Sequence, residues 1–367
     1  MLGIQFHVDL QTMITLNFDK KLETLIKVLS SWKRRNLTPI GKITVIKTLL
    51  ISIFNHLFIT LPNPSKEFLK TINTLLFDFV WNGKSKVKNS ILVKEYNQGG
   101  LNMTNIESFI ASLKLTWIRR LCLMDGNWSL LAAIYIDKYK LLNCGKEYAL
   151  NTANKITNMF WKDTLNAFVL LCSKQTVDSS NLYNYPLFYN EEILVNKKSI
   201  FNATCFEAGV FYVSDLMESR DKFMSHETFC SNFKIKINFL EFHGMVGAAK
   251  NFLKNNKIKD KNCLSNFNIR PIMPPLIDII LRNTTGAKPF YNLINSNDDF
   301  PISQTSWEKT FLQKFDAAEW QNIYNLPFIL SKNSNLQWFQ YRLNHRIIGT
   351  NDLLFKMNIT TDDKCTF

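Results

Sequence analysis

The sequence LNFDKKLETLIKVLSSWKRR, residues 16–35, gives the clearest indication of the fold class. Its apolar side chains recur every three or four residues, at Leu22, Leu25, Ile26, Leu29 and Trp32. Because an α-helix has 3.6 residues per turn, this spacing places them on one face and predicts an amphipathic helix. Asn17 is the predicted N-cap. Lys33, Arg34 and Arg35 close the helix, where cations favour the negative end of its dipole.

Two further helix starts follow this first helix. Thr38-Pro39 combines a capping hydroxyl with a proline suited to the first helical position, and predicts a largely buried helix over residues 41–58. Asn63-Pro64 predicts a third helix that ends around residues 81–83. Its inward-facing side chains are predicted to be Phe68, Leu69, Ile72, Leu75, Leu76 and Phe79.

The remaining sequence is less regular but still favours helices. In residues 84–96 apolar and polar side chains alternate, which predicts strands or an extended loop, and Gly99-Gly100 marks a turn. Thr104 and Glu107 have capping-box spacing just before the apolar helix predicted at residues 108–123. A new element is expected at residues 206–217. Helices are expected again at residues 239–252 and from Trp307 to the end.

Composition agrees with a mainly α chain that contains minor β structure. The chain has 367 residues but only 12 glycines and 10 prolines, which argues against a turn-rich all-β fold and against long disordered stretches. We predict three consecutive regions: a helical region at 1–125, a connector at 126–265 and a helical C-terminal segment at 266–367.

The net charge of +14 is not spread evenly along the chain. Residues 19–47 contain eight Lys or Arg against two acids. Clustered cations attract polyanions by pairing with phosphates and releasing counterions, so this pattern favours a nucleic-acid partner. Two alternatives stay open. The positive charge could favour an anionic membrane, or it could reflect only a Lys-rich coding bias that keeps the protein soluble.

Neither a membrane span, nor a leader, nor a disulfide framework is indicated. The apolar run at residues 48–61 is short and contains Asn55 and His56, which fits a buried helix better than a bilayer span. The N-terminal MLGIQFHVDLQ lacks the pattern of a secretory signal. The seven cysteines are scattered: Cys122, Cys144, Cys172, Cys205, Cys230, Cys263 and Cys365. We therefore expect reduced thiols and an intracellular location, cytoplasmic or nuclear.

No catalytic or metal site is evident. Asp298-Asp299 and Asp362-Asp363 lie in polar stretches without the strand context of a two-metal site, and we interpret both pairs as solvated turns. None of the histidines has ligand spacing with Cys or Glu, and no nucleotide-binding or nucleophile motif is found. We expect no cofactor, no bound zinc, no small-molecule substrate and no primer extension. His345, in RLNHR, is one candidate for a phosphate contact.

Positive charge next to aromatic residues is the remaining signal. Trp32, Trp117 and Trp338 each precede a basic cluster. Aromatic faces can stack on unpaired bases, but on an amphipathic helix they also simply face the core, and we favour the core for the tryptophans. The predicted phosphate contacts are Lys33, Arg34, Arg35, Lys42, Lys47, Arg119, Arg120, Arg342 and Arg346. The amide groups at the second helix start, Thr38-Pro39, should add a place where an anion can dock.

Several segments in order resemble one family. They are LGIQF (2–6), residues 29–50 with W-x-x-R-x-L-x-x-x-G-K, residues 61–84 with F-x-W-x-G-K, residues 98–120 with a G-G-L block, and residues 338–367. Together they are similar to the region downstream of the catalytic palm in reverse transcriptases of non-LTR (LINE-like) retrotransposons. The resemblance is clear over about the first 120 and last 30 residues and looser between them.

This resemblance implies a thumb-like helical region that holds template and primer, followed by a connector. In that family the catalytic aspartates precede the LGI segment, so their absence from this chain is expected. Cys365 would be the first member of the family's cysteine-histidine cluster, and both ends therefore look truncated. The expected function is non-catalytic binding of RNA or RNA–DNA hybrid. The alternative is a helical scaffold or protein-interaction module without a nucleic-acid role.

Overall fold

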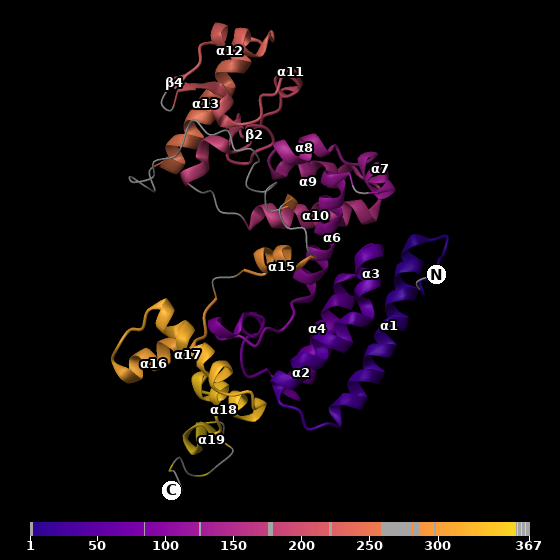
Figure 1. Ribbon diagram of the computed structural model, residues 1–367, viewed down its shortest axis with the longest axis vertical. Helices are drawn as coiled ribbons and strands as arrows, with labels where there is room; N and C mark the ends of the chain where they lie inside the picture. Colours follow the sequence, from indigo (N-terminus) through magenta and orange to yellow (C-terminus); the bar gives the residue numbers. More distant parts are fainter. Residues whose placement is uncertain are drawn as a thin grey trace. The chain divides into compact units, whose positions relative to one another are not determined.

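The computed structural model describes residues 3–83, 85–124, 126–174, 179–219, 222–257, 280–281, 286–296 and 299–356, together with residues 358, 361 and 364. Residue contacts divide the chain into two units. Unit 1 combines residues 1–107 with 297–367, and unit 2 comprises residues 108–296. Both units are helical, and the described part of unit 2 adds two small sheets (Figure 1), so the predicted mainly α fold is confirmed.

Unit 1 begins with the long helix α1 (Leu10–Lys33), which starts earlier than predicted. Its N-cap is Asp9, whose carboxylate accepts the N–H of Thr12 at 2.7 Å. The predicted N-cap, Asn17, lies inside the helix and is buried; its amide exchanges two hydrogen bonds with the backbone of Gln5. Ile26 was predicted on the buried face but is 47% exposed.

The second predicted helix is confirmed as a continuous helical stretch with a change of winding. It comprises α2 (Pro39–Val45), the π-helical turn η1 (Ile46–Leu50), the 3₁₀ turn η2 (Ile51–Phe54) and α3 (Asn55–Thr60). Thr38 caps it, as predicted, by accepting the N–H of Gly41. Unlike the shorter apolar run, this whole stretch is long and apolar enough to cross a membrane, by length and composition alone. Its inward side chains, among them Leu50 and Leu57, are fully buried in unit 1, but others such as Leu49 are exposed, so the helix is partly rather than largely buried.

The third helix, α4 (Lys66–Trp81), packs against α1 and α2 (Figure 1). Ser65 caps it, one residue after the predicted Asn63-Pro64 start. Four phenylalanines join these helices, with neighbouring ring centroids 5.3–6.0 Å apart: Phe18, Phe54, Phe58 and Phe68. The helix ends as predicted, at Asn82 in the left-handed conformation.

Where strands or an extended loop were predicted at residues 84–96, the described residues form irregular backbone with short helical turns. They contain α5 (Asn89–Leu92) and the 3₁₀ turn η3 (Tyr96–Gln98). The predicted turn at Gly99-Gly100 is confirmed: Gly99 has a positive φ of 80°, and a Cβ on Gly100 would lie 1.9 Å from the carbonyl oxygen of Lys94. Local backbone bonds such as Val93 N–H to Asn89 O replace any strand pairing here.

The C-terminal helices belong to unit 1 and confirm the helices predicted after Trp307. They are α16 (Ser303–Phe311), α17 (Ala317–Leu330), α18 (Ser334–Asn344) and α19 (Asn351–Lys356). Helix α17 packs on η3, where Tyr96 stacks on Phe328 at 4.0 Å, and α18 contacts α2. The two ends of the chain thus share one unit. The three predicted regions are consecutive in sequence, so they did not place the N-terminal and C-terminal helices in one unit. The predicted boundary at 265/266 lies outside the described residues.

Unit 2 starts with a group of short helices around α6. This group comprises α6 (Ile106–Leu123), α7 (Asn127–Ala133), α8 (Lys138–Asn143), α9 (Lys146–Lys155), α10 (Met159–Ser173) and α15 (Lys288–Ile294). Helix α6 begins two residues after Thr104 of the predicted capping box. Trp117 is buried, and its ring meets Phe160 and Trp161 of α10 edge to face. Helix α10 packs on α9 and contacts α15.

The rest of unit 2 has its own aromatic core. Its elements are η4 (Ser179–Asn184), α11 (Ala203–Glu207), η5 (Val213–Leu216), α12 (His226–Phe233) and α13 (Phe239–Lys257). Strand β1 (Leu194–Val195) pairs with β2 (Lys198–Ser199), and β3 (Met217–Ser219) with β4 (Lys222–Phe223), both antiparallel. Phe188, Phe229, Phe242 and Phe252 are buried together. The elements predicted at 206–217 and 239–252 are therefore present.

Candidate nucleic-acid interface

The turn between α1 and α2 exposes three consecutive cations, Lys33, Arg34 and Arg35. Short backbone bonds hold this turn, from the N–H of Arg35 to Trp32 O at 3.1 Å and from Leu37 N–H to Arg35 O at 2.9 Å. The guanidinium of Arg35 lies 4.2 Å from the ring centroid of Trp32, which is half-buried. In the described chain no carboxylate pairs with any of the three cations, so their charge faces solvent.

Lys42 is not part of this exposed surface, and its prediction as a phosphate contact is wrong. Its side chain is only 4% exposed. The ammonium donates to Asn82 Oδ1 at 2.6 Å and to Val80 O at 3.4 Å, and lies 5.5 Å from the ring centroid of Phe79. Burial, and secondarily the charge of Lys33, lower the pKa of Lys42. Lys42 thus joins α2 to the C-terminal end of α4.

Lys47 is exposed on η1, but it does not continue a stripe with Lys42. Residues five apart are rotated by roughly 140° around an α-helix, so one of them faces the core when the other faces solvent. The sequence could not show which of the two lysines was buried, because both lie in an apolar helix. The burial of Lys42 depends on Asn82, which comes from another helix end.

The helix start at Thr38-Pro39 offers little to an anion. The hydroxyl of Thr38 accepts the N–H of Gly41 at 3.3 Å, and Thr38 O accepts the N–H of Lys42 at 2.9 Å. Pro39 has no N–H. The first turn therefore already uses amide groups that a docked phosphate would need.

Two lysines that the sequence reasoning missed follow directly after α4. Lys86 and Lys88 are both exposed, within six residues of Asn82. Because Asn82 holds Lys42, this loop begins beside α2. The available signal was a pair of lysines shortly after a predicted helix end, two and four residues beyond the F-x-W-x-G-K block.

Arg342 reaches the same region from the C-terminal part of the chain. Trp338 lies 5.9 Å from Trp81, the last residue of α4, between ring centroids. The guanidinium of Arg342 lies 5.8 Å from the Trp338 centroid and 6.0 Å from that of Phe339. Since α18 also contacts α2, the structure brings Arg342 to the end of α4 that carries Asn82.

Arg346 and His345 are engaged inside unit 1. One nitrogen of Arg346, Nη1, donates to Ser306 O at 3.1 Å and to Thr310 Oγ1 at 3.0 Å, and its guanidinium lies over Trp307 at 4.7 Å. His345 is 8% exposed, and its Nε2 lies 2.9 Å from Gly99 O. Burial lowers the pKa of His345 to about 4, against the opposing effect of the Gly99 hydrogen bond. The imidazole is therefore neutral at pH 7, and its candidacy as a phosphate contact is wrong.

Arg119 and Arg120 belong to unit 2. Arg120 lies over the buried ring of Trp117, 4.6 Å from its centroid. Arg119 Nη1 donates to Gly286 O at 3.4 Å. Both arginines are half-buried. The nine predicted contacts thus separate into exposed cations, engaged side chains and a pair on the other unit.

The described residues offer neither a metal site nor a reactive thiol among Cys122, Cys144, Cys172 and Cys205. Within them, no three His, Cys, Asp or Glu side chains lie together in a way that could hold a metal. Burial raises the pKa of Cys122, Cys144, Cys172 and Cys205 to about 12, which keeps these thiols protonated. Asp298, Asp362-Asp363, Cys263 and Cys365 lie outside the described residues.

Comparison with known proteins identifies a distant relative. No family model matches the chain. The transposon TX1 uncharacterized 149 kDa protein of Xenopus laevis is 24% identical over 220 residues, a match that covers 56% of this chain and 17% of that protein. The chain therefore spans about a sixth of the relative it matches. This match supports the transposable-element origin that the sequence resemblance implies.

Proposed function

We propose that unit 1 binds RNA or an RNA–DNA hybrid through its phosphates, as a non-catalytic part of a transposon-encoded protein. The observation that carries the proposal is a group of cations from three separate segments around the C-terminal end of α4. We call it the cationic surface; it comprises Lys33, Arg34, Arg35, Lys86, Lys88 and Arg342. Lys42 lies buried beneath it and joins its parts through Asn82.

Five of the six cations of this surface are exposed, and Arg342 is half-buried. Asp78, one turn before the end of α4, is the nearest acid in sequence to Asn82, and it forms no ion pair in the described chain. Each cation that neutralises a nucleic-acid phosphate releases counterions, which favours binding and makes it dependent on salt. Cations held on three different segments fit a rigid phosphate backbone better than a single flexible tail would.

The tryptophan rings beside the cationic surface are partly or fully covered, although Phe339 beside Arg342 is 48% exposed, so backbone contacts are favoured over base contacts. Arg35 lies on Trp32, Trp81 is 8% exposed, and Trp338 packs between Trp81 and Arg342. Base stacking needs an open aromatic face. Contacts limited to phosphates position the nucleic acid but carry no sequence information, so we expect little sequence preference.

The alternative function is a helical scaffold or protein-interaction module. A specific feature favours it: Ile329 and Leu330 at the end of α17 and Leu336 on α18 are 69%, 73% and 58% exposed. Apolar side chains grouped in this way commonly mark protein contacts. A scaffold would bind RNA weakly or not at all, with no dependence on Arg34 and Arg35.

The test is the salt dependence of RNA binding by the whole chain. We expect Arg34→Ala combined with Arg35→Ala to reduce the slope of log affinity against log salt by up to roughly two units, since two phosphate contacts are lost. The loss should be similar for different sequences. The measurement is fluorescence anisotropy of a labelled RNA duplex and an RNA–DNA hybrid between 50 and 200 mM salt.

Lys66→Ala combined with Lys70→Ala is the matched control. It removes the same charge from exposed positions at the opposite end of α4. This control should leave the salt slope at the wild-type value. An unchanged slope in the double arginine variant, or an equal reduction in the control, would favour the scaffold alternative.

A further inference from the structure

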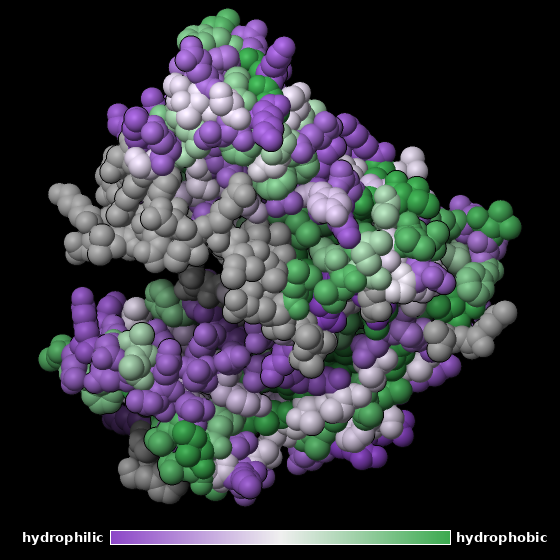
Figure 2. Space-filling view, turned by 45° about the horizontal axis from the view of Figure 1, so that its top comes forward, coloured by the Kyte–Doolittle hydropathy of each residue, from purple (hydrophilic) through white to green (hydrophobic). Residues whose placement is uncertain are grey.

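The segment from α7 to α8 in unit 2 exposes large aromatic side chains. Trp128 is 60% exposed and Tyr139 65%. Exposed aliphatic side chains lie between them in sequence: Leu130, Leu131 and Ile134. Figure 2 shows apolar side chains gathered at the surface on the side where Figure 1 draws α7. In the unit 1 surface, by contrast, the tryptophans next to cations are half-buried or buried.

Trp128 is connected to an arginine through a buried ring. Its centroid lies 6.0 Å from that of Trp117, edge to face, and Arg120 lies on Trp117 at 4.6 Å. Trp117 is anchored by Phe160 and Trp161. One edge of Trp128 is therefore fixed by the core while more than half of the side chain stays open. Such a ring is held in place without losing its stacking surface.

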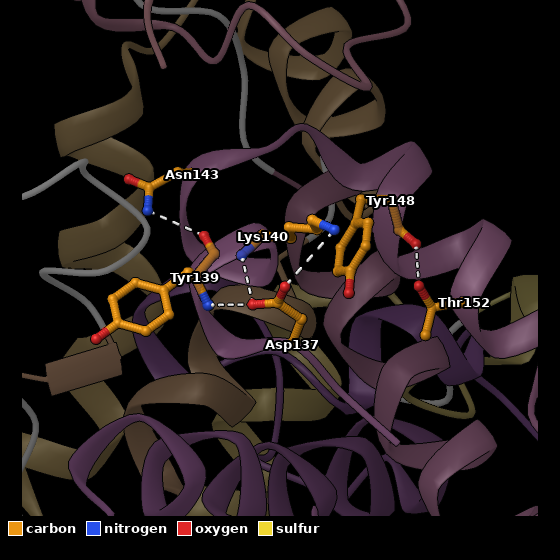
Figure 3. Close-up of polar contacts among 6 residues, drawn as sticks. All are labelled: Asp137, Tyr139, Lys140, Asn143, Tyr148 and Thr152. Carbon is orange, nitrogen blue, oxygen red and sulfur yellow. Dashed lines mark hydrogen bonds and ion pairs between the residues drawn. The ribbon is translucent and has the colours of Figure 1, made fainter. Parts of the chain in front are cut away.

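Tyr139 offers a second open ring next to a cation. The ammonium of Lys138 lies 5.4 Å from the Tyr139 centroid and forms no ion pair in the described chain. The neighbouring Asp137 is already engaged: it accepts the N–H groups of Tyr139 and Lys140 and pairs with the ammonium of Lys140 at 3.7 Å. Figure 3 shows the Tyr139 ring pointing away from these groups and from Tyr148.

We propose that the α7–α8 surface binds an unpaired nucleic-acid strand. Trp128 and Tyr139 stack on bases, and Arg120 and Lys138 contact the adjacent phosphates. Unpaired bases offer open faces to aromatic side chains, whereas paired bases are stacked inside a duplex. The proposal rests on the proposed function for its class of ligand, but it involves another unit and other residues.

The cations decide between a nucleic acid and a protein partner here. A purely apolar docking surface needs no positive charge, yet Lys138 lies beside the open Tyr139 ring, and Arg120 lies on Trp117, the buried ring that Trp128 contacts. Asp137 pairs with Lys140. This leaves positive charge beside the exposed rings, which complements a phosphate backbone. The exposed Leu130 and Ile134 are compatible with the edges and sugars of unpaired nucleotides.

The experiment compares two substitutions of Trp128 in the whole chain. Trp128→Leu keeps an apolar side chain but removes the ring, whereas Trp128→Phe keeps a ring. We expect Trp128→Leu to weaken binding of labelled oligo(U) roughly 5- to 100-fold, and Trp128→Phe to weaken it less. Binding of an RNA duplex should change in neither variant. The double arginine variant of unit 1 should instead weaken duplex binding.

Tyr139→Leu provides an independent test if Trp128 variants lower the melting temperature. Its ring makes little contact with the core, so we expect weaker oligo(U) binding at an unchanged melting temperature. Wild-type oligo(U) affinity in both Trp128→Leu and Tyr139→Leu would overturn this inference while leaving the unit 1 proposal intact. Reduced self-association in sedimentation, with oligo(U) affinity unchanged, would overturn it in favour of a protein partner. A wild-type chain that binds neither oligo(U) nor duplex would overturn both proposals.

Discussion

Units 1 and 2 each bury a lysine, but they surround the ammonium differently. In unit 1, Lys42 donates to Asn82 Oδ1 and Val80 O, at the C-terminal end of α4. In unit 2, Lys114 of α6 is fully buried, and its ammonium lies 4.1 Å from the ring centroid of Phe160, with Asp163 as the charge that favours its protonated form. One ammonium sits at a helix end and the other beside an aromatic ring.

The two environments have different consequences. The C-terminal end of a helix carries partial negative charge on its free carbonyls, which stabilises a cation placed there. Burial lowers the pKa of Lys114 to about 7, against the opposing effect of Asp163. Lys42 therefore contributes to the structure beneath the cationic surface as a charged group, whereas Lys114 changes its charge near neutral pH. The comparison shows that burial alone does not determine what a lysine does.

The tryptophans that carry arginines differ in a similar way. Trp32 in unit 1 is half-buried beneath Arg35, and Trp117 in unit 2 is 8% exposed beneath Arg120. Trp117 also contacts three aromatic rings, those of Trp128, Phe160 and Trp161. In both units an arginine lies on an indole ring, but Trp32 in unit 1 is at the surface, whereas Trp117 in unit 2 belongs to the core.

The largest expected effect is the loss of Trp117. Trp117→Ala should reduce the free energy of unfolding by about 3–5 kcal/mol, because it removes a buried ring and leaves a cavity. Trp32→Ala should cost only about 1–2 kcal/mol, since the ring is already partly in contact with water. Urea unfolding followed by circular dichroism measures both. Equal losses would show that the half-buried position of Trp32 is energetically a core position.

Substituting the buried lysine of unit 1 should have the next largest effect. Lys42→Met keeps the apolar stem but removes the charged hydrogen bonds to Asn82 and Val80, so we expect a loss of about 1.5–3 kcal/mol in the free energy of unfolding. The salt slope of RNA binding should not change, because Lys42 does not reach a phosphate. A slope lower by one unit at unchanged stability would contradict the buried role of Lys42.

Helix patterns in this chain could be predicted because they depend on local spacing. The apolar repeat of α1, the Thr38-Pro39 start and the end of α4 near Asn82 all follow from residues within a few positions. The Asn17 cap was wrong because the actual cap, Asp9, extends the helix by two turns into a weakly periodic stretch. The π and 3₁₀ winding of residues 46–54 has no signal in an evenly apolar sequence.

The site could be predicted only in part because its remaining features depend on distant residues. The exposure of Lys33, Arg34 and Arg35 follows from their position at the end of a helix. The burial of Lys42 depends on Asn82, and the arrival of Arg342 depends on contact between α18 and α2. A linear division into regions likewise could not show that both ends of the chain form one unit.

The smallest expected effect concerns the buried lysine of unit 2 and its dependence on pH. In the unfolded chain the pKa of Lys114 returns to the ordinary value of 10.5, whereas in the fold it is about 7. Between these values the unfolded chain binds a proton that the folded chain does not, so this group makes the fold more stable as pH rises. Below pH 7 both states are protonated, and the full cost of burying the charge is present.

Lys114→Met removes this titration while keeping the apolar stem, and the half-exposed Asp163 stays hydrated. The stability of the variant relative to wild type should therefore be highest at or below pH 7 and should fall by about 1 kcal/mol between pH 7 and 8. Lys162→Met, at an exposed position beside Asp163 on α10, is the matched control, because it also replaces a lysine by methionine but removes no buried ammonium. Urea unfolding at pH 6, 7, 8 and 9 measures both differences. A Lys114→Met difference that is constant across this range would mean that the buried ammonium stays charged, as we infer for Lys42, and the contrast between the two units would disappear.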